Sequence, residues 1–529
     1  MADNADHDRP TLPDAAVTEI TELFEDAVAQ HKTSGVTWAI VGGHTSERPV
    51  LAHGAAGHHE LDRGEPTPGS TPMARDSISR IASMTKSFTA AAVLALRDEG
   101  ALRLDDPVAS HVPESANAFA GGDDAPAVTI RDLLTMSSGL VTDNPWGDRQ
   151  ESMTREQFAA TLRGGLGQVH EVGTGFEYSN TGYALLGRVI DEVAGEDHTA
   201  VIRRRFLEPL GLADTAFETS GLDSARIATG HRLADRTDAT RFEAVPFDSP
   251  GVYGAMAGLY STVDDVAVWM RFLAAADAAL GAGPHASATA DRPPLARASR
   301  REMQQLHRHQ KLRPQPADQD GSSPGFDRIR GYGYGLVIEQ FADLGEVISH
   351  SGGYPGYGSF MIWHRDSGVG VVALANSKYA PVTPLSMQAL RVLLRADPPV
   401  LTTRDPVAAP RTVRAAGAAL DWLRGMGDSH ADMWFADNMD LDIPRAERRR
   451  RLGAALEAAG RDASALGTLT VEGAHVLSPA HLRWTVPGAT DGREGAEQLP
   501  SVRIDLLMDP RREALIQGLD VTSVPAEKS

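Results

Sequence analysis

The chain has 529 residues, a formal charge of −20 and a pI of about 5.3, and 42% of its residues are hydrophobic. This acidic balance argues against nucleic-acid binding and against adhesion to anionic membranes. The chain contains no cysteine, which excludes disulfides, thiolate metal sites and cysteine nucleophiles. Its acidic first residues lack the apolar core of a secretory signal, and no apolar run is long enough to span a membrane. We therefore expect a cytoplasmic protein.

The N-terminal part of the sequence predicts one helix, then two strands, and then a region of several helices. Residues 13–31 predict an amphipathic helix that opens at Pro13, and residues 36–41 and 50–55 predict two strands joined through a glycine turn. A helical region follows, whose first helix is apolar and Ala-rich. Its helices are predicted at residues 85–96, 129–136, 155–162, 181–193 and 262–275, the last capped by Ser261 or Thr262.

Strand signals return after the helical region, and a closing helix follows them. The strands are predicted at 334–339, 347–350, 358–363 and 369–375, and the helix at 384–394. This order predicts an α+β fold in which an antiparallel sheet carries helices, its N- and C-terminal parts pair, and an all-helical region is inserted between them. Residues 276–329, rich in Ala, Gly, Pro and Ser, predict a loop insertion.

A Pro-containing linker signal at residues 396–406 predicts two domains, 1–397 and 411–529. The second is expected to be a small α+β accessory domain, and the sequence does not indicate its role. Its helices are predicted at 412–426 and 444–459, and its strands at 467–476, 481–486, 502–508 and 513–522.

The segment Ser83-Met84-Thr85-Lys86 stands directly before the apolar helix. Residues three apart share one helix face, and a lysine made neutral by burial can take the proton of a serine. Only five of the 51 basic residues are lysines, and no other lysine follows a serine by three positions. The plain alternative is a capping serine beside an ordinary surface lysine.

Two further motifs carry groups suited to acyl transfer. Tyr178-Ser179-Asn180 offers a phenol for proton transfer and an amide that can orient a substrate. His350-Ser351-Gly352-Gly353 ends a strand signal, where glycine permits close approach and backbone N–H groups can hold an oxyanion. Taken singly, the first is also typical of a turn beside a half-buried ring, and the second of a strand that ends in a glycine turn. No histidine cluster indicates a metal site, and no cofactor is expected.

Together, the order and spacing of the three motifs resemble the serine β-lactamase and penicillin-recognising peptidase family. The similarity is to its class C β-lactamase and D-alanyl-D-alanine carboxypeptidase branch, with its esterases and D-aminopeptidases. It covers about residues 15–397 and extends to segments 80–89, 102–108, 129–140, 258–265 and 331–336. The resemblance implies Ser83 as the acyl-accepting nucleophile and Lys86 and Tyr178 as the general base and acid. It also implies a substrate-binding set and an oxyanion hole made by the N–H groups of Ser83 and Gly353. The substrate-binding set comprises Asn180, His350, Ser351, Gly352 and Gly353.

Two departures from the family pattern bear on the substrate. His350 stands where many relatives carry the lysine of Lys-Thr-Gly, and Met136-Ser137 stands where many have His-Thr. Because imidazole is largely neutral at pH 7, a permanent cation for a β-lactam carboxylate is missing there. We therefore expect a serine hydrolase, an esterase or a D-amino-acid-specific peptidase or amidase, acting on a small ester, amide or short peptide. The alternatives are a β-lactamase or D-alanyl-D-alanine carboxypeptidase, an acyltransferase, or a non-catalytic penicillin-binding-like sensor. The oligomeric state stays open.

Overall fold

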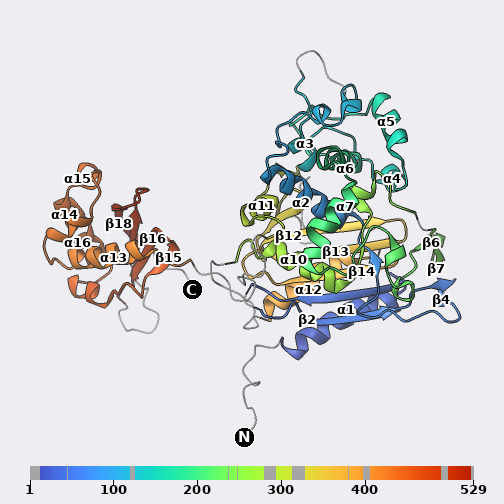
Figure 1. Ribbon diagram of the computed structural model, residues 1–529. Helices are drawn as coiled ribbons and strands as arrows, with labels where there is room; N and C mark the ends of the chain where they lie inside the picture. Colours follow the sequence, from blue (N-terminus) through green and yellow to red (C-terminus); the bar gives the residue numbers. More distant parts are fainter. Residues whose placement is uncertain are drawn as a thin grey trace, which may run out of the picture. The chain divides into compact units, whose positions relative to one another are not determined.

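The computed structural model describes residues 12–525 except 45, 63, 120–124, 236, 247, 279–292, 312–327, 379, 397–405 and 490–498. The chain divides into two compact units, Met1–Thr403 and Arg404–Ser529 (Figure 1). The division falls within the expected linker, most of which lies outside the described residues.

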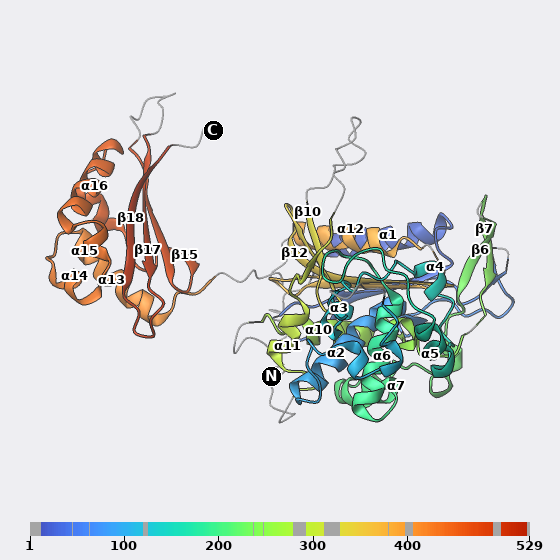
Figure 2. The same cartoon turned by 90° about the horizontal axis from the view of Figure 1, so that it is seen from above.

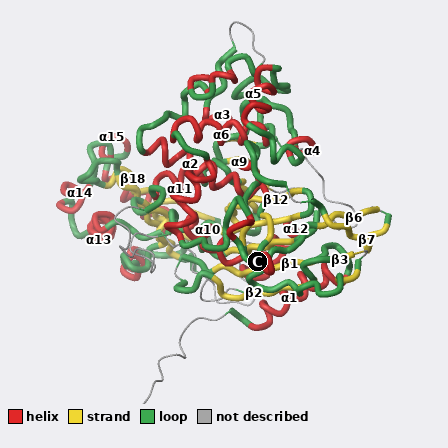
Figure 3. Tube along the Cα trace, turned by 45° about the vertical axis from the view of Figure 1, so that its right-hand side comes forward, coloured by secondary structure: helices red, strands yellow, loops and turns green. Residues whose placement is uncertain are grey.

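An eight-stranded antiparallel sheet forms the centre of the first unit (Figure 3). Its order is β2-β1-β14-β13-β12-β11-β10-β9. Strand β1 pairs with β14, which confirms that the two ends of this unit meet in one sheet. The strands are β1 (Gly35–Val41), β2 (Val50–Gly57), β9 (Arg308–His309), β10 (Arg328–Tyr332), β11 (Val337–Phe341), β12 (Gly345–Tyr354), β13 (Tyr357–His364) and β14 (Gly370–Ala375).

Helices cover both faces of the sheet (Figure 2). On one face, α1 (Asp14–Ala29) and α12 (Val382–Arg395) pack against each other and the strands, and Phe24 stacks on Trp38 with ring centroids 5.6 Å apart. Burying one such side chain contributes roughly 1.5–3 kcal/mol. The other face packs on α10 (Val263–Ala274), whose first turn is capped by Thr262 and not by Ser261.

The helical region centres on α2 (Thr85–Asp98), which is buried from Thr85 to Leu96 and packs against α6 and α9. The other helices of this region are α3 (Ile130–Leu134), α4 (Asn144–Gly147), α5 (Arg155–Arg163), α6 (Asn180–Ala194), α7 (His198–Ile202), α8 (Glu208–Leu210) and α9 (Gly254–Ala257). Threonine capping boxes begin α3 and α5, where the sequence predicts helix starts. The expectation of an all-helical insertion is wrong in one respect, because the hairpin of β6 (His231–Asp235) and β7 (Asp238–Ala244) lies within it.

Three other predictions for the first unit need correction. The strand expected at 334–339 begins only at Val337, because Gly335 has a φ of +69° and turns the chain. Strand β12 continues through Gly353, so the third motif is not a glycine turn after a strand. The segment 276–329 is not loop throughout, since it holds α11 (Arg297–Met303) and β9; its residues 279–292 and 312–327 lie outside the described part.

The second unit has a four-stranded antiparallel sheet in the order β15-β16-β17-β18, packed with helices around the buried Trp422 and Trp484. Its elements are α13 (Pro410–Leu423), α14 (Ser429–Trp434), α15 (Met439–Asp442), α16 (Arg445–Ala458), η8 (Ala463–Thr468), β15 (His475–Ser478), β16 (His481–Val486), β17 (Ser501–Met508) and β18 (Ile516–Val524). The strand expected at 467–476 is wrong, because a 3₁₀ helix occupies its start. Across both units, the described helices include none with the length and apolar character to cross a membrane.

Candidate active site

Ser83 and Lys86 lie where a short 3₁₀ helix, η1 (Ala82–Met84), runs into α2. The Nζ atom of Lys86 is 3.0 Å from Ser83 Oγ, as the Ser-x-x-Lys spacing predicts. Ala82 has a φ of +48°, a left-handed conformation that costs a non-glycine residue about 1 kcal/mol or more. The strained turn brings Ser83 to a pocket wall, while Lys86 stays fully buried.

Lys86 has two further partners, which define the direction of its lone pair. Its Nζ atom donates to Oδ1 of Asn180 at 2.8 Å and to the carbonyl oxygen of Met256 at 3.0 Å. Burial lowers the pKa of Lys86 to about 7, although three carboxylates nearby oppose the shift. Both oxygens only accept hydrogen bonds, so they take the two hydrogens of the neutral amine. The lone pair of that amine then faces Ser83 Oγ.

Tyr178 completes this group from the opposite side. Its phenol lies near enough to Ser83 to interact with it, and its ring centroid lies 5.0 Å from Lys86 Nζ. Burial raises the pKa of Tyr178 far above its ordinary value, so the phenol keeps its proton at neutral pH. Two groups suited to proton transfer therefore lie beside Ser83: the protonated phenol of Tyr178 and the amine of Lys86, whose pKa is near 7.

The start of α6 positions Asn180. Ser179 caps this helix by accepting from the N–H of Gly182. The carboxylate of Asp143 accepts from the N–H groups of Asn180 at 2.7 Å and Thr181 at 2.8 Å. A carboxylate satisfies these unpaired donors and suits the positive end of a helix. The sequence motif identifies Asn180 but not Asp143, which fixes its backbone.

Strand β12 runs close beside the nucleophile. A Cβ atom on Gly352 would overlap Ser359 Oγ and the carbonyl oxygen of Ile81, so only glycine permits this approach. Strand β11 pairs with β12 no further than Ser349. Beyond that residue, backbone groups on the same edge of β12 have no strand partner within the described residues. Gly353 has no atom near its Cβ direction and is exposed in the pocket.

His350 reaches the pocket wall, but protein groups occupy both of its ring nitrogens. Nδ1 is 2.7 Å from the carbonyl oxygen of Ser351, and Nε2 is 2.9 Å from the hydroxyl of Tyr332. Burial, together with the charge of Lys86, lowers the pKa of His350 to about 3. The ring is therefore neutral and carries its proton on Nδ1, so its hydrogen-bonding capacity is already used.

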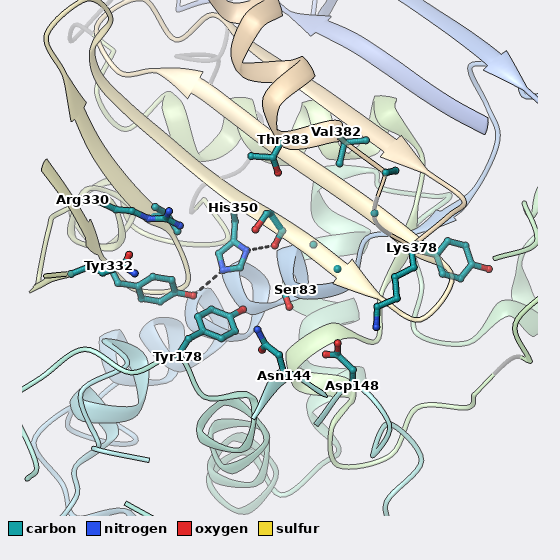
Figure 4. Close-up of a pocket in the computed structure, with 18 of the residues that line it drawn as sticks. Ser83, Asn144, Asp148, Tyr178, Arg330, Tyr332, His350, Lys378, Val382 and Thr383 are labelled. Atoms are coloured by element: carbon teal, nitrogen blue, oxygen red, sulfur yellow. Dashed lines mark hydrogen bonds between the residues drawn. The ribbon is translucent and has the colours of Figure 1, made fainter. Parts of the chain in front are cut away.

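A pocket of about 510 Å³ is lined by most of the predicted site residues (Figure 4). Its walls include Ser83, Tyr178, His350, Ser351, Gly352 and Gly353, whereas Lys86 and Asn180 do not line it. The other lining residues include four polar or charged ones to which sequence reasoning gave no role in the site, namely Asp148, Arg330, Tyr332 and Lys378. The prediction that the site lacks a permanent cation therefore needs correction. Only the position of His350 lacks one, since Arg330 and Lys378 line the same pocket.

In the described part of the chain, one group has the spacing of metal ligands: Asp191, Asp197 and His198. The carboxylate of Asp191 lies 2.8 Å from the guanidinium groups of Arg155 and Arg188 and 3.0 Å from Nδ1 of His198. These contacts neutralise Asp191 and engage the histidine, so the group is explained as an ion-pair network.

Comparison with known proteins supplies the family. The family model described as Beta-lactamase matches residues 20–394. Protein flp of Staphylococcus aureus (strain COL) is 29% identical over 311 residues, which cover 57% of this chain and 53% of the relative. The chain thus spans about half the length of that curated relative.

Two solved structures share the fold. One is the octameric penicillin-binding protein homologue from Pyrococcus abyssi, with 21% identity, a TM-score of 0.57, and coverage of 96% of this chain and 99% of the other. The second is the D-stereospecific amidohydrolase from a Streptomyces species, with 23% identity, a TM-score of 0.53, and coverage of 71% and 97%. The family match spans the sheet, the helical region and all three motifs, and the chain therefore belongs to the Beta-lactamase family.

Proposed function

We propose that the chain is a serine hydrolase that cleaves an ester or amide bond through an acyl-enzyme on Ser83. The contact between Lys86 Nζ and Ser83 Oγ carries this proposal. An amine with a pKa of about 7, whose hydrogens are engaged by Asn180 and Met256, can accept the serine proton near neutral pH. A purely structural lysine gains nothing from a lone pair aimed at a serine.

In the acylation step, Lys86 takes the proton of Ser83 as Oγ attacks the carbonyl carbon. The N–H groups of Ser83 and Gly353 would hold the negative oxygen, which the unpaired edge of β12 makes possible. Tyr178, protonated and beside Ser83 in the pocket, delivers a proton to the leaving group. Lys86 can restore the tyrosine proton, so the charge balance of the site is conserved.

In the deacylation step, a water molecule takes the place that the leaving group vacates. Tyr178 and Lys86 together accept its proton, and the resulting hydroxide attacks the acyl carbon. Ser83 then leaves as the alcohol and recovers its proton. No step needs a metal ion or an organic cofactor.

For the substrate, we propose small esters or D-amino acid amides and esters in preference to β-lactams and cell-wall peptides. The neutral His350, with both nitrogens occupied, contributes no charge to a substrate carboxylate. Arg330 and Lys378 supply positive charge elsewhere in the pocket, so this preference depends on the position of the cation and not on its absence. The likeness to a D-stereospecific amidohydrolase is consistent with amide substrates.

Hydrolysis of p-nitrophenyl butyrate by wild type and the Ser83→Ala variant tests the activity. We expect turnover that Ser83→Ala abolishes, and labelling of the Ser83 peptide by a fluorophosphonate probe in mass spectrometry. An active Ser83→Ala protein, or an adduct elsewhere, contradicts the mechanism, and the absence of Ser83-dependent turnover favours a sensor. On the same protein batch, a chromogenic cephalosporin with a kcat/KM equal to or above that of the ester contradicts the substrate preference.

A further inference from the structure

Asp148 places a carboxylate in the pocket that contains Ser83 (Figure 4). It is half-buried and follows directly after α4, whose Gly147 lies against the side chain of Asn180. Its backbone N–H is bonded to Asn144, but within the described residues no hydrogen bond or ion pair engages its carboxylate. A partly desolvated carboxylate without a partner is costly, unless a ligand supplies the missing cation or donor.

Asp148 also lies near the reacting groups. Among the charges that act on Lys86, that of Asp148 is the largest, and the same carboxylate acts on Tyr178. A substrate whose carbonyl carbon rests on Ser83 would therefore bring the substituents of its α-carbon within range of this carboxylate. A positively charged substituent would gain a charge-assisted hydrogen bond there, and an alkyl group would leave the carboxylate unpaired.

We propose that Asp148 binds an ammonium group on the acyl part of the substrate, so that the enzyme selects amino acid amides or esters with a free amino group. This inference rests on the proposed hydrolase function and specifies its substrate class. Burial raises the pKa of Asp148 to about 6, which leaves most of the carboxylate ionised at pH 7. An α-amino group, with a reference pKa of about 7.7–8.0, is mostly protonated at that pH.

Lys378 is the competing cation, because it lines the same pocket and acts electrostatically on Asp148. Lys378 has an interaction of its own, and its charge lowers the pKa of Asp148 by less than burial raises it. Lys86 and the exposed Arg149 also act on Asp148; the pKa of Lys86, about 7, means that much of it carries no charge under these conditions. The carboxylate thus retains the capacity to bind a substrate ammonium.

Two matched anilides test the proposal. D-Alanine p-nitroanilide and isobutyric acid p-nitroanilide differ only in an ammonium group in place of a methyl group. At pH 7 we expect the wild type to prefer the alanine compound in kcat/KM by about tenfold or more, the size of one charge-assisted hydrogen bond. Asp148→Asn should remove this preference. The control Asp62→Asn, on the exposed side of the short strand β3 (Leu61–Asp62), should keep it.

Two outcomes overturn the proposal: a wild type without the preference, or an Asp148→Asn variant that loses the same factor on both anilides. The second would mean that Asp148 acts only through Lys86.

Binding gives a test that needs no turnover. D-Alaninamide should bind the Ser83→Ala protein at least tenfold more tightly than isobutyramide in an NMR titration, and adding Asp148→Asn should equalise the two. Equal affinities for the Ser83→Ala protein contradict the proposal even if the chain hydrolyses no ester.

Discussion

The hydroxyl of Tyr332 lies 2.9 Å from Nε2 of His350, and this contact fixes the state of the third motif. The other ring nitrogen faces the carbonyl oxygen of Ser351, which can only accept, so Nδ1 carries the proton and Tyr332 donates to Nε2. His350 is therefore held as a neutral ring by its neighbours. We interpret it as a positioning residue for β12, and it offers a substrate no charge.

Replacing Tyr332 with phenylalanine should leave Nε2 of His350 as a buried acceptor without a partner. We expect a loss of about 1–3 kcal/mol in the free energy of unfolding, measured by denaturant titration. Tyr334→Phe is the control, because its hydroxyl contacts Arg131, whose partly exposed side chain can turn to water. Equal losses in the two variants would contradict a special role for the Tyr332–His350 contact.

The pH dependence of turnover should follow the deprotonation of Lys86. Below pH 7 the amine is protonated and cannot accept a proton, so kcat/KM for p-nitrophenyl butyrate should rise about tenfold per pH unit and level off above about pH 7. His350, whose pKa is about 3, should add no step between pH 5 and 8. A flat profile over this range, or activity that falls as the pH rises through 7, would contradict a neutral Lys86 as the base.

Lys86→Arg should be nearly inactive although it preserves positive charge. Arginine does not lose its proton in a protein, and its planar head does not fit the three oxygen atoms around Nζ. Tyr178→Phe should lose about 10²-fold or more in kcat, the usual size of a missing acid–base group. Steady-state kinetics on the butyrate ester measures both, with circular dichroism to show that the variants are folded. A Lys86→Arg enzyme whose kcat lies within a few-fold of that of the wild type would contradict the mechanism.

The two glycines of the third motif should respond differently to the same substitution. Gly352→Ala should lower the free energy of unfolding by about 1–3 kcal/mol and reduce turnover, because its Cβ would overlap Ser359 and the Ile81 carbonyl beside Ser83. Gly353→Ala is the matched control, since nothing lies within 4 Å of its Cβ position. Thermal unfolding of both variants measures the difference, and similar melting temperatures would show that the close approach of β12 is not required.

Local sequence signals predict those elements that local chemistry determines. Helix α10 begins where the sequence predicts it, because the Thr262 cap and two aspartates all act within its first turn. The strand expected at 334–339 is wrong because Gly335 adopts a left-handed conformation that hydrophobic pattern does not reveal. The 3₁₀ helix at 463–468 escapes prediction for a similar reason, since its apolar residues are also compatible with a strand.

The residues of the site also differ in whether a local sequence signal predicts them. The three motifs can be found in the sequence because each places its polar residues within four positions of one another in the chain. Asp148 and Arg330 reach the pocket only through the packing of α4 and β10, and each is a common residue without a local signal. Lys378 is different, because lysine is scarce in this chain and that scarcity alone makes it a candidate.

The two units should be separable. The buried clusters of the first unit end at Leu393, and the cluster of the second begins at Ala415, so each unit has a hydrophobic core of its own. We predict that a chain ending at Thr403 folds, stays soluble and keeps Ser83-dependent turnover of p-nitrophenyl butyrate within a few-fold of the full chain. Its substrate preference can change if the second unit contributes to selection, and the anilide pair measures that change.

The matching fragment, residues 404–529, should fold alone, which the fluorescence of its buried Trp422 and Trp484 can report in a denaturant titration. A cooperative transition in both fragments, with midpoints close to those in the full chain, is the expected result. If the chain ending at Thr403 is insoluble while the full chain is active, the second unit completes the core of the first. The two would then be one folding unit, and an independent accessory domain would be excluded.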